Sequence, residues 1–159
     1  MASDAATQLE ATRQVRRLLS REQDPPVQQI IDSGVLPRLV SFLECASNPQ
    51  LQFEATWALT NVASTQYTSV VVDLGIVPTL ANLCKSPSAD VREQSVWCLG
   101  NIAGDGCKYR DMILGVPNAV NNILLNVAHP ENISMLRNAT WALSNFCRGK
   151  PQPHLSLVA

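Results

Sequence analysis

The most constraining feature of this sequence is a short motif, Trp-x-Leu-x-Asn, that occurs three times at nearly equal spacing. Its copies begin at Trp57, Trp97 and Trp141, so they lie 40 and then 44 residues apart. A helical unit repeated at this period cannot bury its apolar face alone, and such units stack on their neighbours to build a continuous core. The spacing therefore predicts a chain of stacked helical repeats.

A second marker precedes each tryptophan motif by a fairly constant interval. It reads Gly34-Val-Leu-Pro37, Gly75-Ile-Val-Pro78 and Gly115-Val-Pro117. Glycine tolerates the positive φ that ends many helices, and proline suits the first turn of the next helix. Each repeat is therefore predicted to contain two helices before its tryptophan helix, and about 40 residues is the length at which armadillo and HEAT arrays stack two or three helices per unit.

These signals define the predicted elements and domains. The fold class is all-α, an armadillo-repeat right-handed α-solenoid with about three three-helix repeats after a partial repeat. Asp24 and Asn48 are predicted helix caps. The helices are expected at 7–22, 26–32, 37–46, 50–63, 66–73, 77–85, 89–103, 107–114, 117–128 and 131–147. The expected segments are a flexible N-terminus (1–6), a repeat domain (7–148, divided into 7–22, 24–64, 65–106 and 107–148) and a tail or next-repeat start (149–159).

Composition narrows the function classes. The net charge of −1 gives no positive field for nucleic acid or an anionic membrane, so neither is an expected partner. The five cysteines form no metal-binding spacing and are interpreted as reduced, mostly packing thiols, so no metal or other cofactor is expected. No apolar run approaches the ~18 residues of a membrane span.

The tryptophan helices carry two different stripes. Leu51, Ala55, Leu59 and Val62 form an apolar stripe for the core, whereas the tryptophan and asparagine of each motif share another face. Because burying an amide without a partner costs ~1 to 3 kcal/mol, we predict that the second stripe lines a surface. Tryptophans in the core and a buried asparagine ladder between repeats are the alternatives.

An exposed Trp/Asn ladder suits an extended basic peptide. An asparagine amide can bond both N–H and C=O of a peptide backbone, and indoles can hold the stems of Lys or Arg with a cation–π attraction of ~0.5 to 2 kcal/mol. Glu54, Glu93 and Asp105 are the nearest carboxylates for the charged heads, with solvated helix charge as the alternative for the two glutamates.

The chain resembles the importin-α family of nuclear import adaptors from about Gln8 to Lys150. The resemblance is carried by Leu-Leu-Ser-Arg-Glu (18–22), Trp-Ala-Leu-Thr-Asn-Val-Ala-Ser (57–64), Val-Trp-Cys-Leu-Gly-Asn-Ile-Ala-Gly-Asp (96–105) and Trp-Ala-Leu-Ser-Asn-Phe-Cys-Arg (141–148). It implies an adaptor of cytoplasm and nucleus, whose second to fourth repeats form the major site for lysine- and arginine-rich nuclear localisation signals.

The resemblance also implies roles for single residues. Asp105 would pair with the main lysine of the signal, helped by the Thr68 hydroxyl, and Ser64 and Arg21 would be weaker contacts. The full predicted peptide-binding set is Trp57, Asn61, Ser64, Thr68, Glu93, Gln94, Trp97, Asn101, Asp105, Asn138, Trp141 and Asn145.

The chain departs from the family pattern in three places. The loop after Ser64 is shorter than usual and lacks the family's glycine, the repeats of the minor site do not follow, and no arginine-rich segment for importin-β precedes. Either a fragment or a short paralogue without import activity is consistent with this. We expect self-association through the uncapped last repeat, with Phe146 and the tail 155–158.

Two other function classes were weighed. No nucleophile with its base, carboxylate pair, metal site or phosphate loop is readable, and His129 and His154 are interpreted as exposed loop residues, so no enzyme is predicted. A generic armadillo scaffold for acidic partners would need basic tryptophan helices, whereas here Arg137 is the main basic residue among them.

Overall fold

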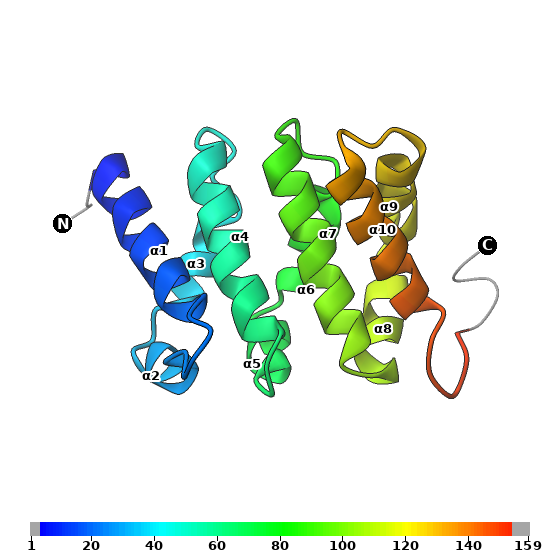
Figure 1. The fold of residues 1–159 in the computed structure, drawn as a ribbon, viewed down its shortest axis with the longest axis horizontal. Coiled ribbons are helices and arrows are strands. Elements are labelled where there is room, and N and C mark those ends of the chain that lie inside the picture. Colours follow the sequence, from blue (N-terminus) through cyan, green and yellow to red (C-terminus); the bar gives the residue numbers. More distant parts are fainter. Residues whose placement is uncertain (1–3, 154–159) are drawn as a thin grey trace. The chain divides into compact units, whose positions relative to one another are not determined.

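The computed structural model describes residues 4–153, and within them it is all-α, with ten helices and no strand. The predicted fold class is confirmed. The helices are α1 (Ala5–Leu19), α2 (Val27–Asp32), α3 (Leu36–Phe42), α4 (Pro49–Ala63), α5 (Thr68–Asp73), α6 (Ile76–Leu83), α7 (Ala89–Gly104), α8 (Cys107–Leu114), α9 (Ala119–Ala128) and α10 (Ile133–Phe146). Figure 1 shows each of them by its label.

The helices form two compact units, divided after Leu74. In the first unit the tryptophan helix α4 packs against α1, α3 and α5. In the second unit α7 packs against α6, α8 and α10, and α9 packs against α6 and α10. Each unit thus contains one pair of neighbouring long helices, α1 with α4 and α7 with α10.

Side-chain caps begin several helices. Asn48 accepts a hydrogen bond from the Leu51 N–H (3.1 Å), which confirms the predicted cap of α4. Asp4 caps α1 through the Thr7 N–H (2.8 Å), so α1 starts at Ala5, inside the segment predicted to be flexible. Asp24 is not a cap, because α2 begins later and has Pro26 at its N-cap position.

The glycine-proline markers behave as predicted in two of three cases. Gly34 and Gly75 have φ of 72° and 74°, the left-handed region that favours glycine. In the third marker Gly115 has an ordinary φ of −75°, and Asn118 takes the positive φ of 63°. Asparagine tolerates this conformation, so the turn between α8 and α9 lies at Asn118. Helix α9 therefore starts two residues after Pro117.

The predicted apolar stripe of α4 lies in the core, where Leu51 is 2% exposed and Ala55, Leu59 and Val62 are fully buried. In the second unit the amides of α9 also enter the interior. Asn122 donates to the Ala81 carbonyl and Asn126 to the Cys84 carbonyl, both at 2.8 Å. These bonds satisfy carbonyl groups of α6 that would otherwise lack partners near its end.

The segment after α10 is held by a buried arginine. Arg110 of α8 is 1% exposed, and its guanidinium donates to the carbonyls of Arg148 and Pro151 and pairs with Asp111 (2.8 Å). Gly149 lies against this guanidinium with a φ of 92°. The predicted apolar tail and His154 lie outside the described residues.

The five cysteines are all free, and they differ in accessibility. Cys84 and Cys98 are buried, and burial raises the pKa of the Cys84 thiol well above its usual range, whereas Cys147 is exposed.

Only the thiolate reacts with disulfide reagents. We therefore expect a thiol-specific reagent at pH 8 to modify Cys147 rapidly in the folded protein and Cys84 only after unfolding. Mass mapping of the labelled peptides measures this, and rapid labelling of Cys84 would contradict the packing described.

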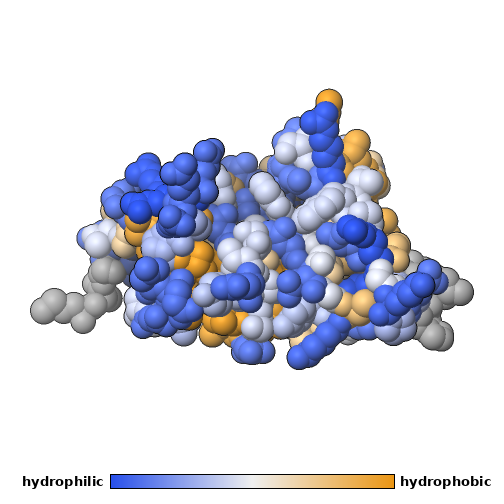
Figure 2. Space-filling model, turned by 60° about the horizontal axis from the view of Figure 1, so that its bottom comes forward, coloured by the Kyte–Doolittle hydropathy of each residue, from blue (hydrophilic) through white to orange (hydrophobic). Residues whose placement is uncertain are grey.

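No helix within residues 4–153 is long and apolar enough to cross a membrane. That part of the chain also brings together no group of three His, Cys, Asp or Glu side chains that could hold a metal ion. On the face shown in Figure 2, hydrophilic residues predominate and the apolar areas among them are small and separated.

Candidate peptide-binding faces

In the first unit, the face of Trp57 is occupied by a cation of the same chain. The Arg16 guanidinium carbon lies 4.2 Å from the centroid of the Trp57 ring, and Phe53 packs at 5.5 Å in a tilted geometry. A guanidinium over an indole face is attracted by the ring quadrupole. The indole is therefore half-buried under α1 rather than open on both sides.

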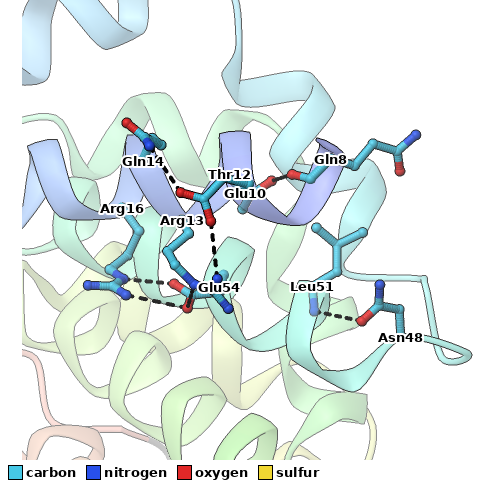
Figure 3. A network of polar contacts seen from close by, with 9 residues as sticks. All are labelled: Gln8, Glu10, Thr12, Arg13, Gln14, Arg16, Asn48, Leu51 and Glu54. Carbon is cyan, nitrogen blue, oxygen red and sulfur yellow. Dashed lines mark hydrogen bonds and ion pairs between the residues drawn. The ribbon is translucent and has the colours of Figure 1, made fainter. Parts of the chain in front are cut away.

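Glu54 pairs with the guanidinium group of the same arginine (Figure 3). Its carboxylate accepts hydrogen bonds from Arg16 Nε at 2.7 Å and from Arg13 Nε at 3.2 Å, and the residue is only 3% exposed. Burial alone would raise the pKa of this carboxyl, but the two arginines outweigh it and the pKa of Glu54 is lowered. The interpretation of Glu54 as a carboxylate for a ligand is therefore wrong, since it binds α1 to α4.

The polar residues at the C-terminal end of α4 are partly engaged. Asn61 is half-buried and donates from Nδ2 to Ser20 Oγ (2.8 Å), and the Ser64 hydroxyl is exposed and donates to the Asn61 carbonyl. Thr68 is 1% exposed and its hydroxyl bonds the carbonyls of Ala63 and Thr65. The Thr68 hydroxyl is therefore engaged at the end of α4 in this structure, and its help to Asp105 stays a prediction.

In the second unit two indoles reach the surface. Trp97 of α7 is 43% exposed and Trp141 of α10 is 38% exposed. The Trp141 ring lies so close to Gly100 that a Cβ on this glycine would be 2.3 Å from Cζ3. Because Gly100 is three residues from Trp97 on the same helix, the two tryptophans lie on neighbouring faces of α7 and α10.

The asparagines of this unit differ from each other. Asn101 is half-buried, whereas Asn145 is 4% exposed, donates to the Gly100 carbonyl at 3.0 Å and accepts from Arg148 at 3.2 Å. Asn145 thus follows the alternative of a buried amide between repeats. In this structure Asn145 joins α10 to α7, and its contact with a peptide backbone stays a prediction.

The remaining predicted residues of α7 also divide by burial. Glu93 is half-buried and accepts from Asn138 Nδ2 at 2.8 Å and from the Ser134 hydroxyl, so Glu93 and Asn138 join α7 to α10. Gln94 is 5% exposed, and its role as a supporting residue of the groove stays a prediction. Asp105 is exposed at the C-cap of α7, between two glycines that line a pocket of about 190 Å³.

A comparison with known protein families decides the class of this chain. The model of the armadillo/beta-catenin-like repeat matches residues 23–64 and 64–104. The chain belongs to the armadillo repeat family. Both matched segments contain a full tryptophan helix, and the third repeat of the sequence follows them with the same motif at Trp141.

Curated relatives of this armadillo chain confirm the predicted resemblance to importin-α. Importin subunit alpha-1b of Oryza sativa subsp. japonica and importin subunit alpha-2 of Arabidopsis thaliana are each 54% identical to it over 157 residues. The matched residues make up 98% of this chain and 29% of each relative. The chain therefore spans less than a third of the length of these proteins.

Several solved structures with a similar fold are engineered proteins. One engineered protein matches 99% of this chain and 38% of its own with a TM-score of 0.87 at 26% identity. A designed armadillo repeat protein in complex with peptide (KR)4 matches 91% of this chain and 59% of its own, with a TM-score of 0.78 at 26% identity.

Sequence reasoning missed the partners that hold the armadillo helices together. Arg13 and Arg16 of α1 and Ser20 at its C-cap contact α4, and Gly100 lies against the Trp141 ring. One signal was readable: Arg13 and Ser20 are seven residues apart, as are Glu54 and Asn61, so each pair lies on one face of its helix. The sequence did not say that these two faces meet.

Proposed function

We propose that this chain is the signal-binding part of a nuclear import adaptor, which binds lysine- and arginine-rich localisation signals as extended peptides. Its importin-α relatives support the adaptor role, and the designed armadillo protein with peptide (KR)4 supports the peptide chemistry. An adaptor of this kind works in both the cytoplasm and the nucleus, and it needs no catalytic group.

The exposed indoles of Trp97 and Trp141 carry this proposal. Each is about two-fifths exposed although the protein has a well-packed apolar core for such side chains. Indole faces in water hold the methylene stems of basic residues while the charged heads remain solvated. In the first unit the stack of Arg16 on Trp57 is an internal example of the same chemistry.

We assign two polar side chains near these indoles to contacts with the proposed peptide. Asn101 is close to Trp97 in the helix and half-exposed, so its amide is the one we assign to the peptide backbone in this unit. Asp105 follows one turn later with an exposed carboxylate for a lysine head. Asn138 donates a hydrogen bond to Glu93, so we propose that these two residues hold α7 and α10 together beside the site and do not contact the peptide directly.

The test is a charge reversal at Asp105. We expect Asp105→Lys to weaken binding of a Lys-Lys-x-Lys peptide about tenfold, because an exposed ion pair is worth up to ~1 kcal/mol and the reversal adds repulsion. Calorimetry in low salt measures the affinity, which should fall further as salt rises. The melting temperature should change little, since Asp105 is exposed.

A matched control uses the other end of the same helix. Asp90 is exposed in the first turn of α7, so Asp90→Lys makes the same charge change about 22 Å away along the helix axis. It should leave the peptide affinity within twofold. Equal effects of the two variants, or tighter binding of an acidic peptide than of the basic one, would favour a generic armadillo scaffold over this proposal.

A further inference from the structure

Arg16 of α1 lies in a setting that suits the side chain of any arginine. Its guanidinium carbon is 4.2 Å from the centroid of the Trp57 ring. Its Nε and Nη2 atoms donate to the two carboxylate oxygens of Glu54 at 2.7 and 3.3 Å, a pair that Figure 3 shows. A ring face beside a carboxylate that accepts two hydrogen bonds matches the planar fork of a guanidinium.

Water has little access to this setting. The side chain of Arg16 is 15% exposed and that of Glu54 is 3% exposed, and Trp57 is half-buried. Salt screens a partly buried ion pair less than a pair on the surface. A cation from outside would therefore have to remove Arg16 before it reached this face of the indole.

The two indoles of the second unit have no comparable occupant. Within residues 4–153, no arginine or lysine of the chain stacks on Trp97 or Trp141. Trp97 is 43% exposed and Trp141 is 38% exposed. The three copies of the motif are thus alike in sequence, but only the indole of the first copy already carries a cation.

Arg16 is difficult to displace for two reasons. It is part of an ordered helix, so it reaches Glu54 without the loss of translational freedom that a separate ligand suffers. A lysine ammonium also lacks the planar fork that makes two parallel hydrogen bonds to one carboxylate. Arg13 donates to the same carboxylate at 3.2 Å, and its charge repels an incoming cation as well.

We propose that Arg16 is a specificity-determining residue, which closes this face of Trp57 to the basic side chains of a bound peptide. Lysine and arginine side chains are then taken by the indole faces that remain open, those of Trp97 and Trp141. This part of the inference rests on the proposed function. The guanidinium site between Trp57 and Glu54 does not depend on peptide binding.

Removing Arg16 should open the site to a small ligand. We expect methylguanidinium to bind Arg16→Ala with a dissociation constant on the order of millimolar and to shift the NMR signal of the Trp57 indole N–H until saturation. The unchanged protein should show no saturable shift. Arg17→Ala is the matched control and should behave like the unchanged protein, because it removes the same charge from an exposed position of α1.

Removing Arg16 should also change the peptide preference. The probes are Lys-Lys-x-Lys peptides with one arginine added at successive positions on either side. At one of these positions the added arginine should raise the affinity for Arg16→Ala about fivefold more than the affinity for the unchanged protein or for Arg17→Ala. Calorimetry measures the affinities.

The unchanged protein offers a test that needs no folded variant. The Arg16 Nε–H signal should keep its NMR contact with the Trp57 ring when Lys-Lys-x-Lys is saturating, and also in an excess of methylguanidinium. This result is expected because neither ligand can compete with an arginine that α1 already holds in place.

Three outcomes would overturn the inference. The first is loss of the contact between Arg16 and Trp57 on addition of either ligand, because Arg16 would then be displaced. The second is equal binding of methylguanidinium to Arg16→Ala and Arg17→Ala, and the third is no position at which an added arginine favours Arg16→Ala. If Lys-Lys-x-Lys binds none of the proteins, the proposed function fails, whereas the methylguanidinium titrations still decide whether Arg16 closes the site.

Discussion

Replacing Glu54 with alanine is expected to lower the free energy of unfolding by about 3 kcal/mol. Glu54 is 3% exposed and accepts hydrogen bonds from both Arg13 and Arg16, so its removal takes away the buried carboxylate that the two arginines share and leaves Arg13 only its exposed pair with Glu10. Removing one member of a buried ion pair costs ~3 to 5 kcal/mol, and the partial exposure of both arginines places this case at the lower end. Urea denaturation followed by circular dichroism measures the change.

The same carboxylate has a consequence for acid stability. The pKa of Glu54 in the folded protein lies below its ordinary value of 4.5. A group with a lowered folded pKa stabilises the fold above its unfolded pKa, and this contribution is lost as the pH falls through the folded value. We therefore expect stability to fall less steeply below pH 4.5 in Glu54→Ala than in the unchanged protein.

Glu10 provides the control for Glu54. It also pairs with Arg13, at 3.2 Å, but its side chain is 50% exposed on the outer side of α1. Glu10→Ala should leave the unfolding midpoint nearly unchanged, because water replaces an exposed pair. Similar losses for both variants would mean that the buried geometry at Glu54 contributes little.

Replacing Gly100 with alanine is expected to destabilise the second unit by about 2 kcal/mol. Alanine normally stabilises a helix relative to glycine by ~1 kcal/mol. Here the added methyl group would lie 2.3 Å from Trp141 Cζ3, so the indole or α10 must move. Overpacking of this kind costs ~1 to 3 kcal/mol and also breaks the Asn145 bond to the Gly100 carbonyl.

The sign of this effect should reverse when the indole is absent. A Trp141→Ala background removes the three atoms closest to the methyl group at position 100, and Gly100→Ala should then stabilise the protein by up to ~1 kcal/mol. Thermal unfolding of the four proteins of this double-mutant cycle measures the coupling. Additive effects in the cycle would show that Gly100 does not receive Trp141 as described.

The helices themselves were predictable from local signals. The period of the tryptophan motif gave three three-helix repeats, and the cap at Asn48 and the positive φ at Gly34 and Gly75 agree with the structure. The apolar stripe of α4 was also correct, because helical periodicity decides which residues share a face before any neighbour is known.

The candidate site was predicted less completely than the fold. Trp97, Trp141 and Asp105 are exposed as expected, whereas Thr68, Gln94 and Asn145 are buried. From the sequence, the tryptophan and asparagine of each motif were expected to lie together on one exposed surface. In the structure a docked neighbour covers part of it, and how much depends on the side chains of that neighbour.

By itself the sequence determined the repeat, the helices, the core stripe and the armadillo class, since all of these follow from spacing along one chain. Only the tertiary structure decided which polar residues remain exposed to water and which contact another helix. Glu54 and Asp105 are both carboxylates on or beside a tryptophan helix, yet α1 brings two arginines to the first and leaves it buried, while the second remains in water. The physical reason is that a side chain's role depends on desolvation and on the groups it meets, and those groups lie about 40 residues away in the chain.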